Sequence, residues 1–350
     1  MTETVTVALT TPLAPEHRHL ITDVDPRIEL LVDDALLPCQ RHAGDHTGDP
    51  AYQRTPEQQQ AFADMLAEAQ VWYGIPDNSS RMLRTLAPSS PALRWVQTMA
   101  AGGGAQVRGA RLSEADLARI TFTTSAGVHG TPLAEFAVMG VLAGTKDLHQ
   151  FRALQTAHDW PDTRGPLRQV AGQTVLILGL GGIGLETARL LKALGTTVLG
   201  VRRTPGTVPN VDEVHPTQAL PELVSRADAV VITLPDTHRT RHLYGAELIA
   251  RTKPGAVIVN VGRGSVIDEP ALIAALTSGH LSSAYLDVTE TEPLPTDSPL
   301  WDLPNVTIYP HVAALSEHED RLIAELFADN LSRFLDGKPM RNVVEPGEFY

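Results

Sequence analysis

One stretch of the sequence, TVLILGLGGIG over residues 174–184, constrains the fold more than any other. It places Gly179, Gly181 and Gly184 in the spacing G-x-G-x-x-G, after an apolar strand and before the helical sequence LETARLLKALG. Glycines in this spacing allow a tight turn, a close backbone approach to a pyrophosphate, and close packing of helix on strand. Free N–H groups at the start of the helix then meet the phosphates. The stretch therefore predicts a dinucleotide site, the alternative being a glycine-rich turn that binds nothing.

A regular alternation of strands and helices follows this turn, up to about Pro310. Such alternation is typical of a doubly wound parallel sheet. The first 120 or so residues look like a second, smaller α/β unit. One long helix is expected from Pro132 to about Leu154, and an amphipathic helix ending at Gly337 closes the chain. The expected strands are Val5–Leu9, Ile28–Val32, Val71–Tyr73, Val175–Leu178, Thr197–Val201, Ala229–Thr233, Ala256–Val259, Ser283–Leu286 and Val306–Ile308.

The length and charge of the chain limit its organisation and its partners. A chain of 350 residues suits two domains, and a net charge of −13 argues against a general binder of nucleic acid or anionic membranes. An anionic substrate would have to be met by local arginines. Cys39 is the single cysteine, which favours a reducing compartment, and neither a secretory signal nor a membrane span is evident. We therefore expect a cytoplasmic protein.

The strand after the glycine-rich turn bears on the choice of dinucleotide. An NAD-specific site usually ends this strand with an acid that binds the ribose 2′-OH. Here the strand ends in Arg202, Arg203 and Thr204. A guanidinium pairs with a 2′-phosphate, whereas a carboxylate would repel it. The sequence favours NADP(H), and NAD(H) stays possible if both arginines are merely solvated.

Three further segments carry residues suited to chemistry on a small acid. Arg263 lies just beyond the buried strand AVIVN, at the end where α/β sheets gather ligands. Asp287 ends a strand, and Glu292 follows five residues later. His311 comes after another strand, behind Pro310. Taken singly, the arginine could be a surface residue, the glutamate a solvated loop acid, and the histidine a satisfied core imidazole.

Several motifs in order give the chain a resemblance to a known family. They run from LRWVQTMAAGGG through TTSAGVHGTPLAEFAVMGVLA, the glycine-rich turn, ITLPDTHRTRHLYGAELIARTKPGAVIVNVGRGSVID and YLDVTETEPLPTDSPLWDLPNVTIYPHVA to NVVEPGEFY. The chain resembles the D-isomer-specific 2-hydroxyacid dehydrogenases over nearly its whole length. The resemblance implies two Rossmann-like, doubly wound parallel-sheet domains with a cleft between them. Residues 1–124 plus 316–350 would bind substrate, and residues 125–315 would bind the dinucleotide.

The resemblance also assigns roles to individual residues. Arg263 would bind the substrate carboxylate and polarise the 2-carbonyl, and His311 would be the general acid for reduction and the base for oxidation. Glu292 would hold the imidazole, so that a proton is available near neutral pH. Asp287 would orient the nicotinamide. Further cofactor contacts are implied at Gly182, Ile183, Leu234, Pro235, Thr240, Val261, Gly262 and His311, and further substrate contacts at Tyr73, Ala101 and Gly102, with Trp301 also near the pocket.

The implied activity is hydride transfer between NAD(P)H and a small 2-oxo or 2-hydroxy acid of the D-isomer, with glyoxylate or hydroxypyruvate as the favoured substrate. The alternatives are a phosphite or other D-2-hydroxyacid dehydrogenase using NAD, and a dinucleotide-sensing, corepressor-like binding protein. The helix after Ala134-Glu135 resembles one at which family members dimerise, so a homodimer is expected. The histidines His19, His42 and His46 lack regular ligand spacing and predict no metal site. The polar segment 39–60, expected to be a surface loop, receives no function.

Overall fold

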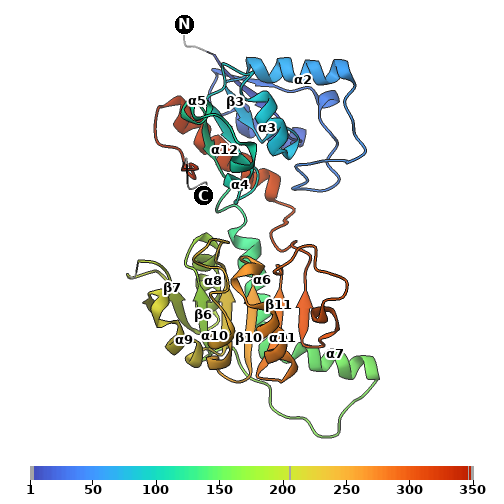
Figure 1. The fold of residues 1–350 in the computed structure, drawn as a ribbon, viewed down its shortest axis with the longest axis vertical. Coiled ribbons are helices and arrows are strands. Elements are labelled where there is room, and N and C mark those ends of the chain that lie inside the picture. Colours follow the sequence, from blue (N-terminus) through green and yellow to red (C-terminus); the bar gives the residue numbers. More distant parts are fainter. Residues whose placement is uncertain (1–3, 205, 346, 348–350) are drawn as a thin grey trace. The chain divides into compact units, whose positions relative to one another are not determined.

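The computed structural model describes residues 4–204, 206–345 and 347, and the chain divides into two units. Unit 1 contains residues 1–129 and 315–350, and unit 2 contains residues 130–314 (Figure 1). The sequence had placed the two boundaries at 124/125 and 315/316. Unit 1 is therefore discontinuous, because its last helix returns to it after the whole of unit 2.

Unit 1 is built on a five-stranded parallel sheet in the order β2-β1-β3-β4-β5. From β1, the chain adds β2 on one side of the sheet and then β3, β4 and β5 on the other side, as in flavodoxin-like sheets. Its strands are β1 (Val5–Leu9), β2 (Ile28–Leu31), β3 (Val71–Tyr73), β4 (Trp95–Gln97) and β5 (Thr121–Thr123). Its helices are α1 (Pro15–Thr22), α2 (Pro56–Glu68), α3 (Ser80–Leu86), α4 (Gly104–Ala110), α5 (Glu114–Arg119) and α12 (Glu319–Leu335).

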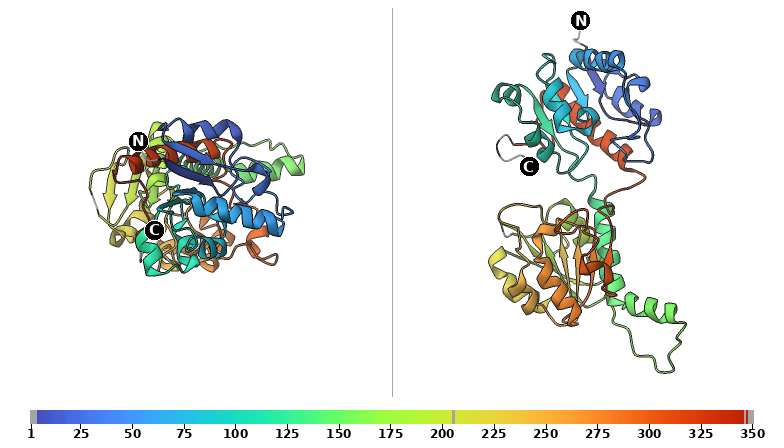
Figure 2. Two further views of the ribbon diagram at one scale, coloured as in Figure 1. Left: turned by 90° about the horizontal axis from the view of Figure 1, so that it is seen from above. Right: turned by 45° about the vertical axis from the view of Figure 1, so that its right-hand side comes forward.

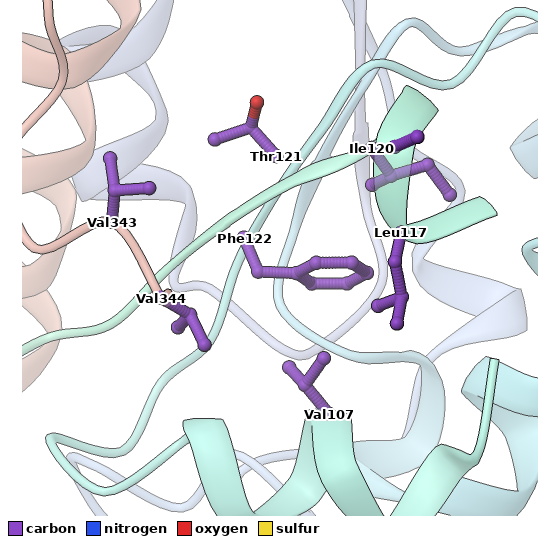
Figure 3. Close-up of a pocket in the computed structure, with 8 residues that line it drawn as sticks. Val107, Leu117, Ile120, Thr121, Phe122, Val343 and Val344 are labelled. Carbon is purple, nitrogen blue, oxygen red and sulfur yellow. The ribbon is translucent and has the colours of Figure 1, made fainter. Parts of the chain in front are cut away.

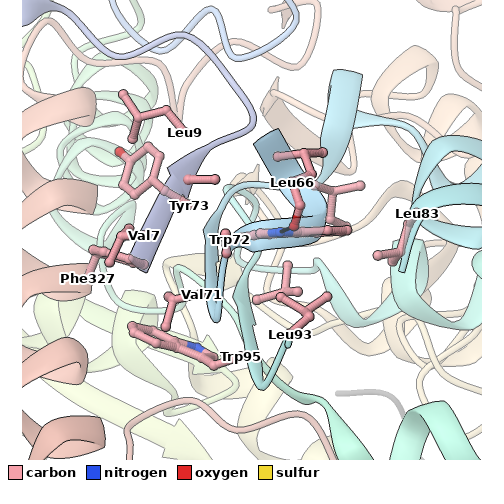
Figure 4. Packing of buried hydrophobic residues seen from close by; sticks show 14 of the residues in the cluster. Val7, Leu9, Leu66, Val71, Trp72, Tyr73, Leu83, Leu93, Trp95 and Phe327 are labelled. Atoms are coloured by element: carbon pink, nitrogen blue, oxygen red, sulfur yellow. Dashed lines mark hydrogen bonds between the residues drawn. The ribbon is translucent and has the colours of Figure 1, made fainter. Parts of the chain in front are cut away.

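Alternate side chains of the unit 1 strands pack against different helices (Figure 4). Trp95 stacks on Phe327 of α12 with ring centroids 4.7 Å apart, and Tyr73 meets the same ring edge-on. On the other face, the indole N–H of Trp72 donates to the carbonyl of Leu66 in α2. The C-terminal helix α12 is therefore part of the core that the first 129 residues begin.

Unit 2 is built on a seven-stranded parallel sheet in the order β12-β11-β10-β9-β6-β7-β8. The order reverses between β6 and β9, which is the position where such sheets bind ligands. The strands are β6 (Thr174–Leu178), β7 (Thr197–Val201), β8 (Glu213–His215), β9 (Ala229–Ile232), β10 (Ala256–Asn260), β11 (Leu281–Leu286) and β12 (Val306–Ile308). Both sheets confirm the α/β fold class expected from the sequence.

Helices cover both faces of the unit 2 sheet. Val175 and Ile177 of β6 face a core shared with α6 and α8, whereas Leu176 and Leu178 face α9, α10 and α11. Because both faces are covered, the strands are apolar throughout instead of alternating in polarity. The helices are α6 (Gly130–Thr145), α7 (Leu148–Ala157), α8 (Gly182–Ala193), α9 (Leu220–Arg226), α10 (Ala246–Arg251) and α11 (Glu269–Thr277).

The prediction of a single helix from Pro132 to about Leu154 is wrong. The structure has α6 and α7 in its place, separated by Asp147, whose φ is 51°. A left-handed residue cannot continue an α-helix, so the chain changes direction there. Gly144 permits the close packing of α6 on the sheet, because a Cβ there would come within 2.6 Å of the Val257 side chain. In Figure 2, α7 and the segment after it extend away from the unit 2 sheet.

The segment 39–60 also departs from the expected surface loop, because part of it is buried. Asp45 and His46 are 5 % and 8 % exposed. Asp45 accepts hydrogen bonds from Arg41 and from the N–H of Gly48, which fold the loop onto itself. The remainder leads into α2, whose first turn is closed by a capping box between Thr55 and Gln58.

Candidate active site

The glycine-rich turn lies at the carboxyl end of β6. Gly179 has a φ of 105° and donates its N–H to the carbonyl of Val201. A Cβ on Gly184 would lie 2.0 Å from the carbonyl oxygen of Gly179, so a side chain there would collide with the turn. A Cβ on Gly181 would meet nothing within 4 Å. Two glycines thus serve the turn itself, and the third borders open space at the start of α8.

The first turn of α8 has the features of a phosphate site. Gly181 caps the helix and offers no side-chain partner to its free N–H groups, which belong to Gly182, Ile183 and Gly184. The helix dipole makes this end favourable for an anion. The backbone at Gly181 is extended, so the turn leaves room for a pyrophosphate to approach. The residues present therefore fit a dinucleotide.

The end of β7 carries no acid. Arg202, Arg203 and Thr204 follow the strand and are exposed, and the N–H of Arg202 donates to the carbonyl of His215 in β8. The nearest acid on the neighbouring strand is Glu213, which is paired with His215 and Arg226. The surface beyond β7 is thus lined by guanidinium groups.

The loop after β9 is packed against its neighbours through small residues. The hydroxyl of Thr233 donates to the carbonyl of Gly179, joining this loop to the glycine-rich turn. The hydroxyl of Thr240 donates to the carbonyl of Pro235. A Cβ on Gly262 would lie 2.6 Å from the carbonyl oxygen of Leu234. The loop after β10 can therefore pack this closely against the loop after β9 only because residue 262 is glycine.

Arg263 is held at the carboxyl end of β10 by a side chain that the sequence reasoning did not identify. The buried Asn260 donates to the carbonyl of Arg263 at 3.1 Å and accepts the N–H of Gly262 at 3.0 Å. The only sequence signal is an amide residue at the end of an otherwise apolar strand. The absence of a side chain at Gly264 lets the loop after β10 lie against the chain that follows β11, because a Cβ on Gly264 would lie 1.9 Å from the carbonyl group of Thr289. Arg263 itself donates to the carbonyl of Gly262, and Val261 before it is buried.

Glu292 and His311 lie beyond β11 and β12. Glu292 Oε2 is 2.8 Å from Nδ1 of His311, and Glu292 Oε1 accepts the N–H of Thr289 at 3.1 Å. Both side chains are partly open to solvent, at 37 % and 48 % exposure. His311 has a φ of 56°, in the left-handed region that residues other than glycine seldom adopt.

Asp287 fixes the chain beside the histidine. Its carboxylate accepts the N–H groups of Val312 and Ala313 at 2.8 and 2.9 Å through Oδ1, and its carbonyl accepts the N–H of His311. Burial raises the pKa of Asp287, and the two backbone hydrogen bonds work against this rise. Asp287 therefore determines the backbone position of the imidazole.

The Glu292–His311 pair has the form of a general acid–base. A carboxylate only accepts hydrogen bonds, so Nδ1 carries the proton of this bond and Nε2 is left to exchange a proton with a ligand. Arg263 and the glycine-rich turn follow other strands at the same sheet edge, so unit 2 places a carboxylate–imidazole pair, a guanidinium and a helix start suited to phosphate along one edge.

Of the remaining residues that the resemblance implies near the substrate, Tyr73, Ala101 and Gly102 lie in unit 1. Ala101 and Gly102 are exposed in the turn after β4. Tyr73 is fully buried against Phe327, so its ring belongs to the core and no face of it is open to a ligand. Trp301, in unit 2, is 52 % exposed, and its indole N–H donates to the carbonyl of Pro295.

A small apolar cavity of about 100 Å³ lies elsewhere in unit 1 (Figure 3). Phe122 of β5, Val107 of α4 and Val344 line it together with other apolar side chains. It contains no charged group that could bind an acid. Within residues 4–204, 206–345 and 347, no cluster of His, Cys, Asp or Glu has a geometry suited to a metal ion, and no helix has the length and hydropathy of a membrane span.

Comparisons with known proteins agree with this geometry. Residues 138–313 match the family model for the NAD binding domain of D-isomer specific 2-hydroxyacid dehydrogenases. The chain is 33% identical to glyoxylate/hydroxypyruvate reductase B of Citrobacter koseri over 328 residues, 90% of this chain and 96% of the relative.

Two solved structures are similar over nearly the whole chain. One is a D-isomer specific 2-hydroxyacid dehydrogenase from Xanthobacter autotrophicus Py2 in complex with NADPH and MES, with a TM-score of 0.75, 29% identity and 100% of each chain covered. The other is the NADPH-dependent glyoxylate/hydroxypyruvate reductase of Sinorhizobium meliloti with NADP and sulfate, with a TM-score of 0.75, 27% identity, and 99% and 100% covered. The chain belongs to the D-isomer specific 2-hydroxyacid dehydrogenase family.

Proposed function

We propose that this chain is a reductase that uses NADPH to convert glyoxylate, hydroxypyruvate or a similarly small 2-oxo acid to the corresponding 2-hydroxy acid, of D configuration where the carbon is chiral. The observation that carries the proposal is the hydrogen bond of 2.8 Å between Glu292 and His311, at the sheet edge that also bears Arg263. The similarity to two proteins described as glyoxylate/hydroxypyruvate reductases supports the substrate class.

The roles follow from the charges that the reaction creates. Bound NADPH supplies a hydride to the carbonyl carbon of the acid. The carbonyl oxygen gains negative charge, which Arg263 and protonated His311 are suited to neutralise. His311 then gives its proton to that oxygen, and Glu292 stabilises the ring before the transfer. The products are a 2-hydroxy acid and NADP⁺, so one hydride and one proton are consumed in each turnover.

The substrate carboxylate needs its own donors. We propose that Arg263 is the donor for this carboxylate in unit 2, and that the N–H groups of Ala101 and Gly102 are the donors that unit 1 offers to an anion. The exposure of Ala101 and Gly102 in a glycine-rich turn supports this assignment. We assign the nicotinamide carboxamide to Asp287, whose Oδ1 is already engaged with the backbone.

Arg202 and Arg203 support the preference for NADPH. They stand exposed where an NAD-specific sheet has an acid, and a 2′-phosphate would bring two negative charges to them. The similar structure from Sinorhizobium meliloti is described as NADPH-dependent. We propose that these two residues, with Thr204, bind the 2′-phosphate.

A panel of 2-oxo acids assayed with NADPH and with NADH tests the function. We expect turnover of glyoxylate or hydroxypyruvate and a several-fold higher kcat/KM with NADPH. Phosphite with NAD⁺ is included as a separate arm. Activity confined to phosphite, or no reduction of any 2-oxo acid, would contradict the proposed reaction. Equal rates with both dinucleotides would contradict the roles of Arg202 and Arg203.

We further propose that the protein is a homodimer in the cytoplasm. The apolar side chains of Leu148 and Phe151 on α7, and of Trp160 and Leu167 after it, are 45 to 82 % exposed in the single chain. Large apolar side chains that are exposed along one segment favour association. Light scattering should give twice the chain mass of 37.7 kDa, and Trp160→Asp should lower it towards the mass of one chain.

A further inference from the structure

Four charged or titratable side chains are buried together in unit 1, and none of them belongs to the candidate site described above. Oε1 of Glu319 lies 3.0 Å from Nε2 of His129 and 3.3 Å from Nε2 of His46. Asp320 accepts the side-chain amide of Gln40 at 3.1 Å and lies 3.9 Å from Nδ1 of His46. We call His46, His129, Glu319 and Asp320 the acid–histidine cluster. Its side chains are 6 to 11 % exposed.

Several buried atoms around the cluster have no hydrogen-bond partner among the described residues. They are Oε2 of Glu319, Oδ1 of Asp320, Nδ1 of His46 and the hydroxyl of Tyr73. Burial raises the pKa of Tyr73 well above its usual value, and the carboxylates of Asp320 and Glu319 raise it further.

The cluster lies where the chain passes between the units. His129 is the last residue of unit 1 before Gly130, and Glu319 comes four residues after the chain returns at Leu315. The chain passes between the units twice, at 129/130 and at 314/315, and we call these two points the crossings. On the unit 1 side, one carboxylate oxygen of Glu319 therefore contacts the chain next to both crossings. His46 belongs to the segment 39–60, which thereby gains a function: it provides the second donor to that oxygen.

The second crossing has a matching attachment in unit 2. Asp287 binds the N–H groups of Val312 and Ala313, directly after His311. Only five residues, 314–318, separate this attachment from Glu319. The backbone that carries His311 is thus tied to unit 2 at one end and to the acid–histidine cluster at the other.

We propose that Glu319 is a positioning residue for the reaction: by accepting hydrogen bonds from His46 and His129, it anchors both crossings to unit 1. Any motion between the units then has to take place within the short spans between the anchors. Changes to hinge residues often alter kcat and KM together. The kinetic consequence rests on the proposed reaction, whereas the anchoring itself does not.

Two variants of the full chain separate this role from general stability. Glu319→Gln has nearly the same size as the native residue, which matters because Gly44 packs closely against Oε2. It removes the charge that holds the two imidazoles. Glu317→Gln is the matched control, because it removes the same charge two residues earlier from a side chain that is 87 % exposed.

Hydrogen exchange followed by mass spectrometry measures the anchor directly. In Glu319→Gln we expect backbone exchange to be about fivefold faster or more in peptides covering 126–132 and 314–322, and unchanged at 174–184. Glu317→Gln should match the wild type everywhere. Equal exchange in the two variants at both crossings would overturn the proposal. If Glu319→Gln does not fold, His46→Gln is measured instead, because it removes one donor and leaves the bond from His129.

Kinetics then tests the positioning role. In Glu319→Gln we expect kcat to fall about threefold to tenfold and KM for the 2-oxo acid to rise, with the Kd for NADPH within about twofold of wild type. Faster exchange at the crossings with unchanged kcat and KM would overturn the positioning role. If the wild-type chain reduces no 2-oxo acid, the proposed function fails, and the exchange result still decides whether Glu319 is the anchor.

Discussion

Glu292 Oε2 and His311 Nδ1 are 2.8 Å apart, although the two residues are separated by 19 positions and follow different strands. The pairing depends on backbone attachments on both sides: Thr289 donates to Glu292, and Asp287 binds the chain after His311. The pair is therefore held in place before any substrate arrives.

Replacement of His311 tests the proton donor. His311→Asn suits the left-handed backbone at this position, because asparagine tolerates a positive φ better than most residues. We expect kcat for reduction to fall by about a hundredfold or more, the size of a lost acid–base catalyst. The Kd for NADPH, followed by fluorescence, should change little. A variant that keeps wild-type turnover would show that another group supplies the proton.

Replacement of Glu292 tests whether its carboxylate holds the imidazole of His311 in one tautomer. Glu292→Gln keeps the shape of the side chain and its bond to Thr289 but removes the negative charge. We expect kcat for reduction to fall by about tenfold or more, because a neutral amide no longer fixes the tautomer of the His311 ring. The measurement is steady-state kinetics with NADPH and a 2-oxo acid. Wild-type kcat in this variant would contradict the role of Glu292.

Replacement of Arg202 tests the recognition of the 2′-phosphate. A hydrogen bond to a charged group contributes about 1.5–3 kcal/mol, so Arg202→Ala should lower kcat/KM for NADPH by about tenfold to a hundredfold. The value for NADH should stay within about twofold. Arg251→Ala is the control, since that side chain is also exposed but lies on α10. A parallel loss with both dinucleotides would contradict the assignment.

Substitution of Gly181 and of Gly184 by alanine should affect different properties, NADPH binding in the first case and stability in the second. Gly181→Ala meets open space and should fold with a normal Tm, but weaken NADPH binding by about tenfold or more, about 1.4 kcal/mol. Gly184→Ala places its Cβ 2.0 Å from a carbonyl oxygen and should destabilise the fold by about 1–3 kcal/mol. Thermal unfolding and titration with NADPH distinguish the two. Equal effects on Tm would contradict this division of roles.

Glu319 gives unit 1 a defined dependence on pH. Burial would raise its pKa, but the hydrogen bonds from His129 and His46 outweigh that effect and lower the pKa from 4.5 to about 2. A lowered pKa in the folded state stabilises the protein above the unfolded value and ceases to do so as the pH falls from 4.5 towards about 2. Asp320 and Tyr73 are the other titratable groups facing it.

Urea unfolding at pH 7 and at pH 3.5 checks this dependence. The wild type should lose more stability than Glu319→Gln between the two pH values, because only the wild type has that carboxylate to protonate. Glu317→Gln should behave as the wild type. An equal loss in all three proteins would show that other carboxylates govern the acid sensitivity.

A strand or helix of this fold could be predicted from the sequence when it contains a long enough run of apolar residues. The strands β6, β7, β9 and β10 are buried on both faces and were identified because they are continuous apolar runs. By contrast, β4, β5 and β8 have three residues each and include polar side chains. They are too short to show an alternation of apolar and polar residues, and the sequence did not predict them. The end of α6 was missed because its glycines serve close packing, and the turn at Asp147 has no proline or glycine of its own.

The candidate site shows the same contrast between local and distant information. The glycine-rich turn, Arg263, Glu292 and His311 each follow a strand, where α/β sheets gather ligands. That rule made the last three candidates, and only the resemblance to the family gave them roles. Asn260 could be suspected only as a polar end to an apolar run. The acid–histidine cluster could not be found at all, because His46 and His129 lie 273 and 190 positions before Glu319.

The stacking of Phe327 in α12 on Trp95 of β4 has a consequence for synthesis of the protein. The ribosome releases residues 130–314 as one continuous piece, so unit 2 can fold while translation continues. The core of unit 1 has to wait for residues 319–335, with Trp95 and its neighbours uncovered in the meantime. During that interval the nascent amino-terminal segment is the part of the molecule most in need of chaperones.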